Sequence, residues 1–128
     1  MVIVDSSGWI EYFIDGPLAA VYAKHLKDLT RVITPTIVVY EVYKKIKRER
    51  SEEDALSAIS VMNRTVVVPL TESIALLAAD LSLKHSLPMA DAMVFATAVE
   101  KQCTLISSDG HFEKLEGVTL IDKKTVSG

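Results

Sequence analysis

Short apolar runs alternate along the chain with longer segments in which apolar residues recur every three or four positions. The first run, Val2–Val4, ends at Asp5, and comparable runs lie at 32–33, 66–68, 104–106 and 118–121. A short, continuous apolar run is typical of a strand that is buried on both faces, as in a parallel sheet. The pattern therefore predicts a parallel sheet of about five strands.

The longer segments predict helices between Ser7 and Gly16 and at 18–29, 36–50, 51–63, 71–85 and 89–101. We expect Ser6 and Ser7 to cap the first helix and Thr34 to cap the third, with Pro35 at its first position.

Two later helices also begin with hydroxyl residues. Ser51 and Thr71 are the expected N-caps, and Leu56, Ile59 and Met62 are expected to face inward from the helix that follows Ser51.

Strands that alternate with helices predict an α/β fold in which helices cover both faces of a parallel sheet. With 128 residues the chain is expected to form a single domain, 1–128, with 122–128 as a frayed tail. No repeat, low-complexity tract or linker indicates a second domain.

Composition narrows the class of protein. The formal net charge of −3 argues against nonspecific coating of nucleic acid, although a local basic patch is compatible with it. The single cysteine, Cys103, excludes an intramolecular disulfide and fits a reducing, cytoplasmic setting. No apolar run approaches the roughly 18 residues that span a bilayer. We therefore expect a soluble cytoplasmic protein without a membrane anchor.

Four acidic residues are expected at one edge of the sheet. Asp5 and Asp109 follow predicted strands, and parallel strands end at the same edge. Asp91 lies in the first turn of its helix, and Glu41 lies within two turns of its helix start between apolar neighbours.

Each acid taken alone has a structural alternative. Asp5 could cap a helix, Asp91 could interact with a helix dipole, and Asp109 could be a turn residue. Glu41 is harder to explain in this way, because an isolated acid in an apolar stretch is costly unless it is paired. A shared site explains all four acids.

Clustered carboxylates repel each other and raise one another's pKa values unless a cation neutralises them. An all-oxygen pocket suits Mg²⁺ or Mn²⁺. Zinc lacks ligands, because His25, His85 and His111 are widely spaced and Cys103 stands alone. A metal ion in such a site binds phosphate oxygens and lowers the pKa of a bound water, which attacks in line.

Four segments carry these acids in a distinctive order. They are Asp-Ser-Ser-Gly-Trp-Ile-Glu-Tyr-Phe from Asp5, Pro-Thr followed by apolar residues and Tyr-Glu-Val up to Val42, Leu-Pro-Met-Ala-Asp-Ala-Met-Val-Phe-Ala-Thr-Ala from Leu87, and Thr-Leu-Ile-Ser-Ser-Asp-Gly-His-Phe from Thr104. Together they resemble the PIN-domain ribonucleases, most of all the VapC-type toxins of toxin–antitoxin pairs. The resemblance covers essentially the whole chain. It implies a three-layer α/β/α sandwich and a metal-dependent endoribonuclease.

The resemblance also implies roles for individual residues. Asp5, Glu41 and Asp91 match the family's acid triad, Asp109 matches a more variable fourth acid, and Ser6 matches a small hydroxyl residue. Asp5 and Asp91 are then expected to hold Mg²⁺ or Mn²⁺ directly, with Glu41 and Asp109 completing the site. Ser6 could orient the water or a phosphate, or only cap the helix. The expected products carry a 5′-phosphate and a 3′-hydroxyl.

A basic segment follows Glu41 on the same helix and contains Lys44, Lys45, Lys47 and Arg48. Such a strip could bind the RNA backbone, or it could be a solvated helix end favoured by the helix dipole. His111, two residues after Asp109, could contact RNA, but it is expected to be a loop residue without a catalytic role.

The resemblance implies an RNA substrate, a cognate antitoxin protein and a homodimer. A stand-alone PIN nuclease for RNA processing or turnover is the near alternative, and a non-enzymatic metal- or protein-binding module is the alternative from another class. A phosphotransfer protein fits less well, because the third strand ends at Val68 and Pro69 without an acceptor Asp.

Overall fold

A computed structural model of the chain describes residues 1–123. In this part of the chain, five parallel strands form one sheet in the order β3-β2-β1-β4-β5. The strands are β1 (Val2–Val4), β2 (Val32–Pro35), β3 (Val66–Val68), β4 (Thr104–Ser107) and β5 (Val118–Leu120). At the central strand β1, Val2 pairs with Val32 on one side and with Thr104 on the other. The predicted parallel sheet is confirmed.

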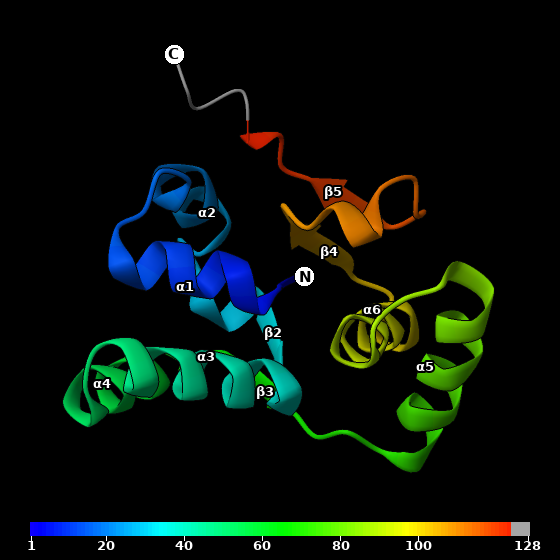
Figure 1. Cartoon of the computed structure of the whole chain (residues 1–128), viewed down its shortest axis with the longest axis horizontal. Coiled ribbons are helices and arrows are strands. Elements are labelled where there is room, and N and C mark those ends of the chain that lie inside the picture. Colours follow the sequence, from blue (N-terminus) through cyan, green and yellow to red (C-terminus); the bar gives the residue numbers. More distant parts are fainter. Residues whose placement is uncertain (124–128) are drawn as a thin grey trace.

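Helices lie on both sides of the strands, as Figure 1 shows. One side carries α1 (Ser6–Ile14), α2 (Ala19–His25), α3 (Thr36–Glu49) and α4 (Glu52–Met62). The other side carries α5 (Glu72–His85) and α6 (Met89–Lys101), which connect β3 to β4. The 3₁₀ helices η1 (Leu29–Arg31) and η2 (Gly110–Phe112) lie before β2 and after β4. Among residues 1–123, no helix is long and apolar enough to cross a membrane.

The core packs tightly around β1 and the start of α1. Ile3 and Val4 are fully buried, and so is Trp9 on α1. Gly8 approaches the ring of Tyr22 so closely that a Cβ atom at residue 8 would overlap with it. This packing fixes the beginning of α1 against the end of β1.

The first helix is capped by Asp5, so the prediction of a cap at Ser6 or Ser7 is wrong. The backbone N–H of Asp5 still donates to the carbonyl of Ile106 in β4, which holds Asp5 in an extended conformation. Its carboxylate accepts the N–H of Gly8 at 3.1 Å. The alternative role of Asp5 as a helix cap is therefore confirmed. The same carboxylate also lies at the edge of the sheet.

Thr34 does not cap α3, because it belongs to β2. Its fully buried hydroxyl lies 2.6 Å from that of Thr65, which in turn donates to the carbonyl of Met62. Pro35 occupies the cap position of α3 without a side-chain hydrogen bond. A partner distant in the sequence thus keeps Thr34 in the sheet.

The predicted helix at 18–29 is too long. α2 ends at His25, and Asp28 caps η1 by accepting the N–H of Thr30 at 3.1 Å.

On α4 the buried residues are Ala55, Ala58 and Met62, whereas Leu56 is 55% exposed. The predicted inward position of Leu56 is therefore wrong: the helix packs through Ala55, Ala58 and Met62. The predicted caps are confirmed, because Ser51 accepts the N–H of Asp54 and Thr71 accepts the N–H of Ile74.

The single domain over 1–128 stays a prediction. Of its expected frayed tail, 124–128 lie outside the residues that the structure describes, while Lys123 lines the cavity beside Glu41.

Candidate metal centre

The four predicted acids gather where β1 and β4 end. Asp5 directly follows β1, and Asp109 lies two residues beyond β4, the neighbouring strand. Asp91 lies in the first turn of α6, and Glu41 lies in the second turn of α3. Burial, together with the negative charge of Asp109, raises the pKa of the other three carboxyl groups. The four acids therefore interact with one another although they come from four different elements of the fold.

Asp5 is the most buried of these acids, with 6% of its surface exposed. One carboxylate oxygen accepts hydrogen bonds from the Ser7 hydroxyl at 2.8 Å and from the N–H of Gly8, and the other oxygen accepts one from the Ser107 hydroxyl. Burial raises the pKa of Asp5, and these hydrogen bonds lower it. Because each carboxylate oxygen has two lone pairs, Asp5 can make these bonds and still offer an oxygen to a cation.

Ser107 connects two of the acids. Its fully buried hydroxyl donates to Asp5 and accepts the backbone N–H of Asp109 at 2.9 Å. The carboxylates that follow β1 and β4 are therefore fixed relative to each other. The sequence-based prediction of the site does not include Ser107, although a hydroxyl residue two positions before Asp109, at the end of an apolar strand, was an available signal.

Ser6 lies beside Glu41. Burial raises the pKa of the Glu41 carboxyl group, and a hydrogen bond with the Ser6 side chain lowers it. The charges of Asp5 and Asp109 raise it further. The structure thus brings Ser6, at the start of α1, together with an acid on α3.

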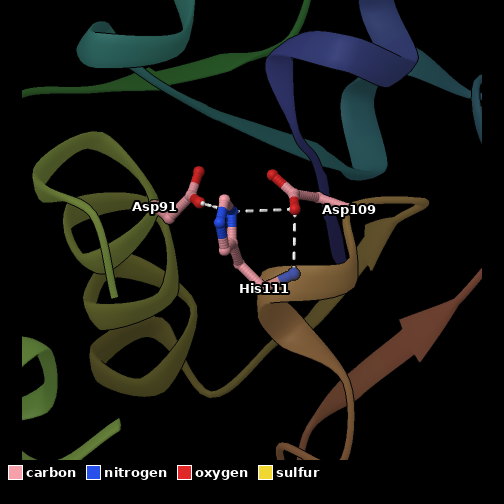
Figure 2. Close-up of side chains that lie close together, drawn as sticks. All are labelled: Asp91, Asp109 and His111. Atoms are coloured by element: carbon pink, nitrogen blue, oxygen red, sulfur yellow. Dashed lines mark hydrogen bonds and ion pairs between the residues drawn. The ribbon is translucent and has the colours of Figure 1, made fainter. Parts of the chain in front are cut away.

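His111 also reaches the acids, as Figure 2 shows. Its Nδ1 lies 2.9 Å from Oδ2 of Asp91 and 3.0 Å from Oδ1 of Asp109. Its backbone N–H donates to the same oxygen of Asp109 at 2.9 Å. The sequence predicted a loop position for His111 but not its contacts with two acids. Its position two residues after Asp109 was the available signal.

The electrostatics of this group favour a cation. Burial and the charge of Asp109 raise the pKa of Asp91 to about 6, although His111 lowers it. Donor atoms of Asp91, Asp109 and His111 all lie within 4.8 Å of one another. Carboxylates that destabilise one another are relieved by a divalent ion, so the donor set fits one.

A cavity of about 740 Å³ opens between α1 and α3 and includes Ser6 and Glu41 in its lining. Three of the predicted RNA-binding residues line it, namely Lys44, Lys45 and Arg48. Lys47 is not among the lining residues, and its Nζ lies 3.3 Å from a carboxylate oxygen of Glu52. The basic segment is therefore divided between the cavity and another face of α3.

Comparison with known proteins identifies the family. The model of the PIN domain matches residues 2–118. The chain therefore belongs to the PIN domain family. Among curated proteins, none matches the chain.

Solved structures share the fold. A toxin–antitoxin complex from Klebsiella pneumoniae gives a TM-score of 0.80 at 19% identity, with 93% of this chain and 96% of that chain covered. VapC20 from Mycobacterium tuberculosis, a sarcin-ricin loop cleaving toxin, gives 0.77 at 21% identity, with 95% and 100% covered. DNA-bound VapBC from Salmonella typhimurium gives 0.76 at 13% identity, with 95% and 97% covered. The predicted PIN-like α/β fold is confirmed.

We expect the raised pKa of Asp91 to make the metal-free protein less stable as the pH rises. Its pKa is about 6 in the folded chain against an ordinary value of 3.8. Between these values the folded state binds more protons than the unfolded state, so the free energy of unfolding falls with rising pH. Asp91→Asn should therefore be more stable than the wild type at pH 7 by about 1–2 kcal/mol, and this gain should shrink toward pH 5.

Urea unfolding in EDTA at pH 5 and pH 7 measures this difference. Asp80→Asn, which removes an exposed acid on α5, controls for the loss of one charge and should keep the wild-type dependence on pH. An Asp91→Asn protein that is less stable than the wild type at pH 7 would contradict the account.

Proposed function

We propose that the chain is a metal-dependent endoribonuclease that hydrolyses RNA phosphodiester bonds. The observation that carries the proposal is the convergence of Asp5, Glu41, Asp91 and Asp109 at one edge of the sheet, where burial and mutual repulsion favour a divalent cation. Membership of the PIN domain family supports the same activity.

In this proposal Asp5 and Asp91 hold Mg²⁺ or Mn²⁺ directly, and Glu41 and Asp109 complete the site directly or through water. Oxygen donors are the ligands that both ions prefer. When bound, such an ion polarises a phosphate and lowers the pKa of a water molecule. The remaining steps belong to the chain's own residues.

The serines orient the acids. Ser107 donates a hydrogen bond to the Asp5 carboxylate and so fixes the orientation of its oxygens. Ser6, which hydrogen-bonds with Glu41, is placed to orient the attacking water or a phosphate oxygen. Water attacks phosphorus, the bond from phosphorus to the 3′-oxygen breaks, and the products carry a 5′-phosphate and a 3′-hydroxyl.

The cavity beside Glu41 offers a path for the RNA backbone. Lys44, Lys45 and Arg48 line it together with Glu41, so basic side chains and one of the four acids share this cavity. Phosphate contacts of this kind supply affinity without reading sequence. The basic side chains are proposed to hold the strand while the acids act on one phosphodiester bond.

We further propose that the nuclease is a cytoplasmic toxin restrained by a cognate antitoxin protein, and that it forms a homodimer. Two of the solved structures with this fold are described as a toxin–antitoxin complex and as a sarcin-ricin loop cleaving toxin. The proposed homodimer is supported by an exposed apolar stripe on α5. Leu83 is 85% exposed, and Leu76, seven residues earlier, is 62% exposed. In a homodimer, a second copy of the chain would cover this stripe.

The purified, antitoxin-free protein is expected to cleave structured RNAs in Mn²⁺ or Mg²⁺ and to lose this activity in EDTA. Asp5→Asn should lower the cleavage rate by at least about 100-fold, because it removes a charged oxygen donor. Asn is also a good N-cap residue, so α1 should remain folded. Gel analysis of end-labelled RNA, with product ends mapped, measures both effects.

Asp28→Asn is the matched control. Asp28 also caps a helix, η1, and η1 leads directly into the start of β2, at the end of the sheet opposite to the four acids. It should cleave at the wild-type rate. Cleavage that persists at the wild-type level in EDTA or in Asp5→Asn would refute the metal-dependent mechanism.

We expect the double variant Lys44→Ala/Lys45→Ala to bind RNA more weakly and with a weaker dependence on salt. Loss of two phosphate contacts should reduce the slope of log K against log salt by about one to two units. Fluorescence anisotropy in the Asp5→Asn background keeps the RNA intact during the measurement.

Lys47→Ala removes a lysine from the same helix that pairs with Glu52 and does not line the cavity. It should leave the affinity and the salt slope unchanged. An equal loss in both proteins would mean that the cavity is not the RNA path.

A further inference from the structure

His111 brings a nitrogen atom into a group of oxygen donors. Its side chain is 57% exposed and comes from η2, while Asp91 comes from α6 on the other side of the group. Figure 2 shows the imidazole ring between the two carboxylates. A small ion that enters this edge would therefore meet a nitrogen donor as well as oxygen donors.

The donor separations suit an octahedral ion. In an octahedron with bonds of about 2.1 Å, neighbouring ligand atoms lie about 3.0 Å apart. Nδ1 of His111 lies 2.9 Å from an oxygen of Asp91 and 3.0 Å from an oxygen of Asp109. All three donor atoms lie within 4.8 Å of one another, near the separation of about 4.2 Å between ligands on opposite sides of such an ion, so small side-chain movements suffice to bring them to one ion.

The chain holds His111 in this position. Its backbone N–H donates to Asp109, whose own backbone N–H donates to the buried hydroxyl of Ser107. These bonds connect the histidine to the end of β4. A donor that is fixed in this way loses less freedom when it binds an ion.

The identity of the donor decides which ion is favoured. Mg²⁺ is a hard ion that is bound almost entirely by oxygen and keeps several waters. Imidazole is a ligand of transition ions, whereas carboxylates suit Mg²⁺ and Mn²⁺ alike. Mn²⁺ accepts both kinds of donor, so a nitrogen donor beside the carboxylates favours Mn²⁺ over Mg²⁺.

We propose that His111 is a nitrogen ligand of the divalent-metal site and that it makes the site select Mn²⁺ over Mg²⁺. The inference rests on the proposed metal-dependent function. In the rival role, His111 is a substitute cation that only pairs with Asp91 and Asp109. Its side chain must then move away from the two carboxylates when a metal ion binds. The two roles predict opposite effects when the imidazole is removed.

The first test is spectroscopic and needs no variant. The wild-type protein is freed of metal with EDTA, dialysed and loaded with one equivalent of Mn²⁺, without RNA. Electron spin-echo modulation then reports nitrogen nuclei bonded to the ion. The proposal expects modulation from one imidazole nitrogen, which His111→Ala should lose and His25→Gln should keep. His25 is the matched control because it lies away from the acids, which follow the ends of strands. It ends α2, and the segment after it leads to the start of β2.

The second test is isothermal titration of the same proteins with Mn²⁺ and with Mg²⁺. His111→Ala should bind Mn²⁺ about tenfold more weakly than the wild type, with less than about a twofold change for Mg²⁺. His111→Asn puts an amide oxygen near the position of Nδ1, and it should reduce the preference for Mn²⁺ while Mg²⁺ binding is retained.

The outcomes separate the inference from the proposed function. Metal binding without nitrogen modulation, or tighter binding after His111→Ala, would overturn the ligand role and leave the proposed nuclease intact. Failure of the wild-type protein to bind either ion would overturn both. Nitrogen modulation together with a selective loss of Mn²⁺ affinity would establish the inference.

Discussion

Repulsion among four carboxylates at one edge of the sheet is the interaction on which the site depends. Burial and neighbouring charge raise the pKa of Asp5, Glu41 and Asp91 above their ordinary values. A protein that only needed stability would not gather acids in this way, because each one makes ionisation of the others less favourable. A bound cation turns the same arrangement into a source of affinity. This change in the balance supports our proposal that the cluster is a metal centre, in which the repulsion present without metal is relieved by the bound ion.

The fold holds these acids close together by anchoring each one separately. β1 is the central strand, so Asp5 leaves the sheet next to Asp109, which follows the neighbouring strand. Ser107 joins the two, and the close approach of Gly8 to Tyr22 fixes the helix that Asp5 caps. Glu41 and Asp91 arrive from helices on opposite sides of the sheet. Hydrogen bonds and packing anchor Asp5 and Asp109, and His111 lies against Asp91 and Asp109 in the metal-free chain.

The sequence was sufficient for the fold and for the four acids, because both follow from local patterns. Apolar runs mark the strands, and the parallel topology brings their ends to one edge. It was not sufficient where the deciding partner is distant in the chain. Thr34 remains in β2 because of Thr65, and His111 meets Asp91 because η2 turns toward α6. No periodicity in the sequence reports such contacts. The roles of the acids and of the basic segment in catalysis and RNA binding stay predictions.

Thermal unfolding of the metal-free protein across a titration of Mn²⁺ tests the central claim most directly. An ion that binds only the folded state stabilises it by about 2.7 kcal/mol at a concentration one hundred times its Kd. The account predicts that Tm rises steadily with Mn²⁺ in the wild type and that the rise is much smaller in Asp91→Asn. A wild-type Tm that does not change with Mn²⁺ or Mg²⁺ would contradict the claim that these carboxylates form a metal centre.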